Sequence, residues 1–101
     1  MLTIESINLI TTDPAVRGGR PCIAGTGLRV IDIAMAALFH QRAPGEIAAD
    51  YDLSLAEVHA ALAYYYQYKE AMDADIRAVI TSADALKAER IGSRGPSLLS
   101  R

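Results

Sequence analysis

The chain has 101 residues, a formal net charge of −2 and one cysteine, Cys22. This length allows one domain with a modest core and excludes two. The slightly acidic charge argues against a strongly cationic nucleic-acid module, because neutralisation of phosphates supplies much of the affinity of such proteins. The single cysteine excludes an intramolecular disulfide and any zinc site built from several cysteines. We therefore expect one small cytoplasmic domain without a metal or a cofactor.

Hydrophobic residues make up 51% of the chain, but five Tyr and one Phe are its only aromatic residues. The core that such a composition can build is thin, which favours oligomerisation as a further source of buried surface. No apolar run approaches the roughly 20 residues that cross a bilayer. Glu5 interrupts the one candidate for a secretory leader. We expect a homo-oligomer, dimeric or higher, that does not enter a membrane.

The first residues alternate between apolar and polar side chains. Leu2 and Ile4 share one phase of the alternation, and Ile7 and Leu9 share the other. A period of two residues is typical of a strand, and a change of phase indicates a bend or a bulge. The pattern therefore predicts a bent strand, or two short ones, over residues 2–9.

Glycine and proline are concentrated in residues 13–30, which hold Pro14, Pro21 and four of the seven glycines. Glycine allows positive φ, and proline favours an extended residue before it. This distribution predicts two tight turns around a short strand at Pro21–Ala24, which would pair with residues 28–30 as a hairpin. So small a ribbon is marginal alone, and we expect its sheet to form across a subunit boundary.

Helical spacing begins after this segment. Apolar residues recur with a helical period from Val30 to Leu38, and residues 42–45 end that pattern. Pro44 suits the first turn of a second, short helix that stops near Tyr51. We expect two helices here, joined by a short loop.

The third predicted helix, residues 54–68, has the clearest start signal. Ser54 and Glu57 form a Ser-x-x-Glu capping box. The apolar residues that follow on one face are Leu55, Val58, Leu62 and Tyr65. The predicted fold class is therefore mainly α: a helix-turn-helix domain of three to four helices with a short N-terminal β-strand or hairpin element.

A fourth helical pattern runs from about Met72 to Ala88. From Ile91 onward the glycine, serine and proline content is typical of a linker or flexible tail, with Leu98 and Leu99 as an apolar anchor. We divide the chain into a domain over residues 1–83 and a C-terminal arm over residues 84–101.

Several motifs are spaced between Ile7 and Ala74. They include Gly18-Gly19-Arg20-Pro21, Gly25-Thr26, Glu46-Ile47-Ala48, Tyr51-Asp52-Leu53 and Ala60-Ala61-Leu62-Ala63-Tyr64-Tyr65. With these motifs the chain resembles the domain-of-unknown-function 433 family, the small VapB-like antitoxins. The resemblance implies a helix-turn-helix fold with an N-terminal β element, dimerisation, and a gene neighbour that encodes a PIN-like ribonuclease toxin.

The second and third predicted helices have the dimensions of a DNA-binding helix-turn-helix. Residues 54–68 contain no Lys or Arg, although recognition helices usually present Arg, Lys, Asn or Gln to the groove. Contacts to DNA would therefore come from a dispersed set: Arg17, Arg20, Arg29, Arg42, Ser54 and His59. The alternative is that the helices only pack together, in a structural oligomerisation or protein-interaction module without DNA binding.

Two groups of residues are candidates for binding a protein partner. The first is Tyr64, Tyr66 and Tyr68, because the tyrosines near the end of the third helix surround more of it than one core can absorb. The second is the set of apolar residues in the C-terminal arm, where basic residues would meet the acidic metal site expected of a PIN-like toxin. These apolar residues are Leu86, Ile91, Leu98 and Leu99.

No catalytic constellation is visible, and Cys22 reads as a buried small hydrophobe. The sequence therefore predicts an antitoxin-like component of a type II toxin–antitoxin system rather than an enzyme. Its expected partners are a PIN-like ribonuclease toxin and, as an additional candidate, operator DNA. Two alternatives stay open at this point: the structural module described above, and an enzyme or redox protein that uses Cys22.

Overall fold

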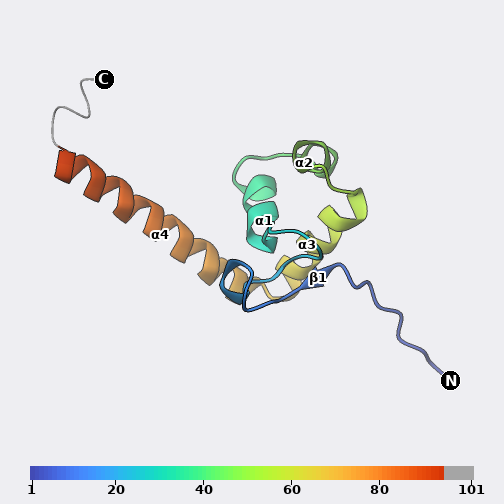
Figure 1. The fold of residues 1–101 in the computed structure, drawn as a ribbon. Helices are drawn as coiled ribbons and strands as arrows, with labels where there is room; N and C mark the ends of the chain where they lie inside the picture. The colour runs from blue at the N-terminus through green and yellow to red at the C-terminus, as the bar shows by residue number, and fades with distance from the viewer. Residues whose placement is uncertain (95–101) are drawn as a thin grey trace.

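The computed structural model describes residues 1–94, and describes side chains as far as Leu86. A short sheet precedes four helices (Figure 1). In chain order the elements are β1 (Ile10–Thr11), the 3-10 turn η1 (Arg17–Gly19), β2 (Cys22–Ile23), α1 (Val30–Leu38), α2 (Pro44–Tyr51), α3 (Leu55–Gln67) and α4 (Lys69–Arg94). The fold is mainly α with a small N-terminal β element, as the sequence predicted.

The sheet is antiparallel and has two strands, with Ile10 of β1 opposite Ile23 of β2. An isolated bridge joins Cys22 to Arg29 on the other side of β2. The predicted hairpin between residues 21–24 and 28–30 is therefore present, but only as this bridge. The strand predicted over residues 2–9 is wrong, because these residues find no neighbouring strand within the chain and a strand exists only where it is paired.

Both glycine turns form where they were predicted. Gly19 has a φ of 81°, and Gly25 a φ of 77°, which are left-handed values that side chains disfavour. In the second turn the Thr26 hydroxyl donates to the carbonyl oxygen of Ile23 at 2.9 Å and accepts from the backbone N–H of Leu28 at 3.0 Å. These bonds return the chain from β2 toward the start of α1.

Carboxylates fix the starts of the helices. The Ser54 hydroxyl accepts from the N–H of Glu57 at 3.1 Å, and the Glu57 carboxylate accepts from the N–H of Ser54 at 2.8 Å, which confirms the predicted capping box of α3. At the start of α2, Glu46 accepts from the N–H of Ala43 at 2.8 Å. Each bond satisfies a backbone donor that would otherwise lack a partner at a helix end.

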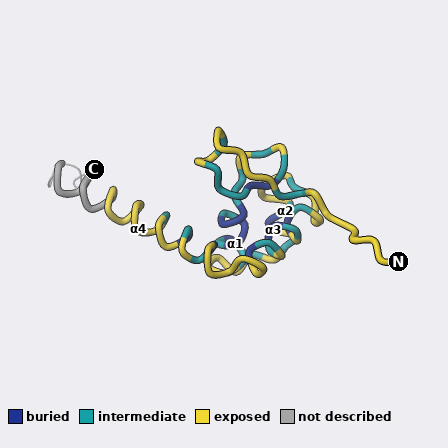
Figure 2. The backbone as a smooth tube through the Cα atoms, turned by 90° about the horizontal axis from the view of Figure 1, so that it is seen from below, coloured by how far each residue is buried: buried dark blue, intermediate teal, exposed yellow. Residues whose placement is uncertain are grey.

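The core lies around α1, whose residues are the most deeply buried part of the chain (Figure 2). Helices α2 and α3 pack against it, and β2 and the first turns of α4 complete the cluster. Its members include Ile23, Val30, Ile33, Ala34, Ile47, Val58, Ala61, Tyr65, Met72 and Ile76. Three residues of the cluster are alanines, Ala34, Ala36 and Ala61, and each buries little area.

Helix α4 begins directly after the bend at Tyr68 and continues to Arg94, beyond both ends of the predicted Met72–Ala88. Residues 91–94, expected as linker, are helical, while Leu98 and Leu99 lie outside the described residues. The radius of gyration is 17.0 Å, against about 13 Å for a compact chain of this length. The radius of gyration is larger because α4 and residues 1–9 extend from the body in different directions (Figures 1 and 2). Among the described helices, none combines the length and the apolar character that a membrane span requires.

Candidate functional site

Arg29, predicted to contact DNA, is engaged at the start of α1. Its guanidinium donates to the Asp32 carboxylate through Nη2 at 2.8 Å and through Nε at 3.1 Å, and the two side chains are only 14% and 20% exposed. Burial opposes ionisation of Asp32, but the side-chain and backbone hydrogen bonds from Arg29 outweigh it and lower the Asp32 pKa. The charge of Arg29 is therefore matched within the chain.

Two more of the predicted arginines face carboxylates. Arg42, in the loop before α2, forms ion pairs with Asp50 and, at 3.7 Å, with Glu46. The Nε of Arg20 lies 3.9 Å from a carboxylate oxygen of Asp75 on α4. Each pair bridges neighbouring elements of the fold, so these cations have structural partners already.

The other residues predicted to contact DNA lie on different elements and do not form one surface. Arg17 donates to the carbonyl oxygen of Gly27 at 3.3 Å, on the side of the glycine turns. The Ser54 hydroxyl serves the α3 cap, and His59 is exposed on α3. Helices α2 and α3 keep the order of a helix-turn-helix, but the exposed side of α3 presents Leu55 and other residues without positive charge rather than a basic surface.

The tyrosines near the end of α3 divide into buried and exposed members. Tyr65 is buried, and its hydroxyl donates to the Asp73 carboxylate at 2.6 Å, which ties α3 to α4. Tyr66 and Tyr68 are exposed. Tyr64 is half-buried, and its ring centroid lies 4.6 Å from that of Tyr68. The predicted partner-binding tyrosines are thus accessible at least in part.

An apolar groove runs between α3 and the base of the N-terminal segment. Its volume is about 420 Å³. We call it the α3 groove; it is lined by Ile7, Ile10, Ala60, Ala63, Tyr64, Gln67 and Tyr68. The sequence points to the tyrosines but not to the groove, because no local pattern relates Ile7 to residues more than 50 positions away.

The second apolar surface lies on α4. Apolar residues recur there at alternating spacings of four and three residues, beginning with Met72 and Ile76 in the core. The same stripe continues along the helix as the outer α4 face, which we define as Val79, Ile80, Ala83 and Leu86; Val79 is half-buried against the core and the other three are exposed. Ile80 is 41% and Leu86 58% exposed. Ile91, predicted to bind a partner, lies on the same helix, but its side chain is outside the described set.

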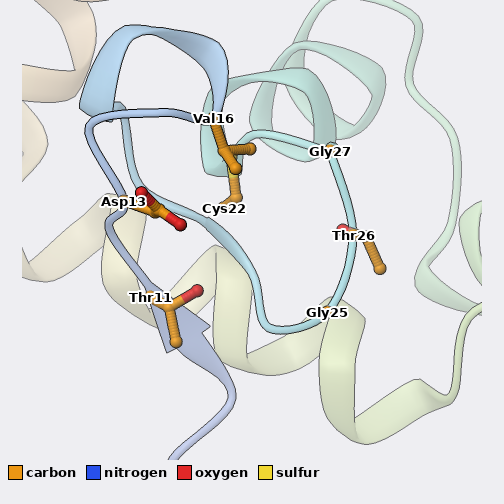
Figure 3. A pocket seen from close by; sticks show the side chains of 7 residues that line it. All are labelled: Thr11, Asp13, Val16, Cys22, Gly25, Thr26 and Gly27. Carbon is orange, nitrogen blue, oxygen red and sulfur yellow. The ribbon is translucent and has the colours of Figure 1, made fainter.

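A pocket of about 370 Å³, with both polar and apolar side chains in its lining, opens between β1 and the glycine turns (Figure 3). The Asp13 carboxylate at its edge accepts from the N–H of Ala15 at 2.9 Å. Burial raises the pKa of the Cys22 thiol, which donates to the carbonyl oxygen of Arg20 at 3.3 Å. A buried, protonated thiol is a poor nucleophile. Within the described residues, no three His, Cys, Asp or Glu side chains come together as metal ligands.

Comparison with known proteins matches the chain to one protein family. Neither the curated proteins nor the solved structures contain a match to the chain. Residues 10–65, more than half of the chain, match the family described as "Protein of unknown function (DUF433)". The match runs from β1 through both glycine turns and the helices α1 and α2 to Tyr65 on α3, so it covers the motifs on which the resemblance rested. The chain therefore belongs to the DUF433 family.

Proposed function

We propose that this protein is an antitoxin-like binding protein of a type II toxin–antitoxin system. It binds a PIN-like ribonuclease through the outer α4 face and the residues that follow it, and it acts by occupying its partner rather than by catalysis. The observation that carries the proposal is the continuation of the core stripe of α4 into solvent, with Ile80 and Leu86 uncovered.

The length of α4 supports a protein partner. Its 26 residues span about 39 Å, and only the first turns contact the body. A single helix of the remaining length is marginal in water unless it packs on something. Apolar side chains at alternating spacings of three and four residues are the anchors by which a helix enters a groove on another protein. The partner should therefore present an apolar groove.

The charge of the following residues supports a partner with an acidic site. Residues 87–101 contain Lys87, Arg90, Arg94 and Arg101 against one acid, Glu89. A cationic segment is attracted to an acidic surface, which raises the association rate and fixes the orientation of the complex. A ribonuclease with an acidic metal site, as the family resemblance implies, offers such a surface beside its active centre.

Substitution of Ile80 and Leu86 by Ser tests the proposal, with the ribonuclease encoded beside the gene as the partner. The two side chains are 41% and 58% exposed, so their complete burial in a complex contributes about 2 kcal/mol together. We expect binding to weaken roughly 30-fold and protection from the toxin to fall. Ala78→Ser with Ala85→Ser is the matched control on the opposite side of α4 and should bind normally.

Full protection by the Ile80→Ser, Leu86→Ser variant would refute this assignment of the surface. The lack of any ribonuclease gene beside this one would favour the structural oligomerisation module instead. Operator DNA is a second candidate ligand because α2 and α3 have the order of a helix-turn-helix. Its affinity should be low, since Arg29 and Arg42 already pair with carboxylates.

A further inference from the structure

The N-terminal arm, residues 1–9, is an apolar segment that is held to the body at its base, where the carbonyl oxygen of Leu9 accepts from the N–H of Ala24 at 2.8 Å. It has neither strand nor helix and runs away from the body into solvent (Figures 1 and 2). Leu2 is 97% and Ile4 93% exposed, and Ile7 and Leu9 follow them along the same segment. Large aliphatic side chains gathered in one exposed segment are typical of an interaction site.

The sheet at the base of this arm is incomplete. β1 bonds to β2 along one edge only, and within the described residues no strand covers its other edge. Two strands of two residues each are too small to be stable alone, and this sheet is supported by packing against α3. A third strand would enlarge it. An open edge also offers unpaired N–H and C=O groups to another extended segment. The open edge of β1 can therefore accept a further strand, and the arm is an extended apolar segment that could supply one.

The α3 groove begins where the arm leaves the body, since Ile7 and Ile10 form one wall. Ala60 and Ala63 form its floor on α3, and the small size of alanine leaves room there for larger side chains. The groove is open, apolar and close to the β1 edge. An extended chain that pairs with β1 could place alternate side chains in it.

The arm of the same chain is not suited to fill this groove. Ile7 already lines it, so Leu2 and Ile4 would reach it only if the chain reversed within Glu5 and Ser6. Residues 1–12 contain neither Gly nor Pro, and they are rich in Ile and Thr, which favour extended backbone; Ser6 and Asn8 are their only turn-favouring residues. The arm therefore points outward, toward a second molecule.

A second copy of this chain fits the arm. Glu5 is the one charged side chain in residues 1–12, so two arms approach each other with little repulsion. A twofold axis would repeat the same contact in both directions, which doubles the apolar area removed from water and closes the assembly as a dimer. From Ile7 to Leu2 an extended chain reaches about 17 Å, enough to cross a neighbouring groove.

We propose that two copies exchange their N-terminal arms. Leu2 and Ile4 of each copy enter the α3 groove of the other, and the arm runs along the open edge of the other copy's β1. This inference does not depend on the toxin-binding proposal, because the arm and α4 extend from different sides of the body (Figure 1). Residues 1–9 also precede the part of the chain that matches the family.

Disulfide trapping tests the exchange directly. Ile4→Cys and Ala63→Cys are combined in one chain that also carries Cys22→Ser, so that no other thiol is present. Under mild oxidation we expect a covalent dimer on a non-reducing gel, and a monomer after reduction. The control pairs Ile4→Cys with Ala85→Cys on exposed α4 and should remain mostly monomeric. A disulfide within one chain, no disulfide, or equal crosslinking of the control would each overturn the proposal.

Light scattering and ultracentrifugation provide a second, independent measurement. We expect wild type to be dimeric at tens of micromolar, and Leu2→Ser with Ile4→Ser, or Ala63→Glu, to raise the dimer dissociation constant at least tenfold. All three side chains are exposed, so circular dichroism should stay unchanged. An equal mixture of the two variants restores one arm–groove contact and should dimerise more than either alone. A wild-type monomer, or dimers unaffected by both changes, would overturn the exchange.

Discussion

The ion pair between Arg29 and Asp32 allows a quantitative test of how α1 is held. Arg29→Met and Asp32→Asn, with the double variant, form a thermodynamic cycle that isolates the coupling between the two side chains. Exposed pairs contribute about 0.2–1 kcal/mol, whereas breaking a fully buried pair costs about 3–5 kcal/mol. These side chains are 14% and 20% exposed and joined by two hydrogen bonds. We therefore expect a coupling of about 1–2 kcal/mol.

Urea unfolding at pH 7 measures each corner of the cycle, and thermal unfolding provides a check. Each kcal/mol should change the melting temperature by about 4–8 °C in a domain of this size. The Asp32 pKa is lowered in the folded state, so the ionised carboxylate contributes its full share to the free energy of unfolding at pH values above the unfolded pKa of about 4. This stabilisation is lost as the pH falls through the folded pKa. A coupling near zero at pH 7, or one unchanged at pH 2.5, would refute the reasoning.

Three further predictions address the helices and the proposed partners. Tyr65→Phe removes the hydroxyl that ties α3 to α4 and should lower the urea midpoint, while Tyr66→Phe, at an exposed ring, should not change it. Truncation after Ala83 should leave the circular dichroism of the domain intact but abolish protection in a co-expression assay, because it removes part of the outer α4 face; full protection would contradict this. Any affinity for a duplex of the upstream region should fall steeply with salt. In a filter-binding titration it should weaken across all sequences when Arg17, which donates to a backbone carbonyl rather than to a carboxylate, becomes Ala; tight, sequence-selective binding that ignores this change would contradict the prediction.

The local elements were predictable because their signals are short in range. Ser54 and Glu57 are three residues apart, and their reciprocal hydrogen bonds form within a single turn. The start of α2 at Pro44 likewise depends on one turn of backbone. The glycine turns at Gly19 and Gly25 required positive φ, which the residue type alone allows. Such features need no knowledge of the rest of the fold.

The sequence is insufficient where the role of a residue depends on a partner that is distant in the chain. Residues 2–9 have a strand pattern, but a pattern does not supply the neighbouring strand, and within one chain these residues form no strand, although the carbonyl oxygen of Leu9 accepts from the N–H of Ala24. The arginines predicted to contact DNA have partners within the chain that no local pattern shows. Arg20, Arg29 and Arg42 pair with carboxylates, and Arg17 donates to a backbone carbonyl. Their contact with DNA stays a prediction. The sequence shows that a side chain is charged, but it does not show whether an opposite charge lies beside that side chain in the folded protein.

Sequence by itself determined the fold class, the order of the helices and the family motifs, because backbone propensity, capping and helical period act over a few residues. The tertiary structure alone decided which apolar surfaces remain uncovered. The α3 groove joins Ile7 to Tyr68, which are far apart in the sequence, and the α4 stripe changes from core to surface after Val79 although its spacing does not change. Burial is a property of the packed chain, since it depends on which elements meet in space.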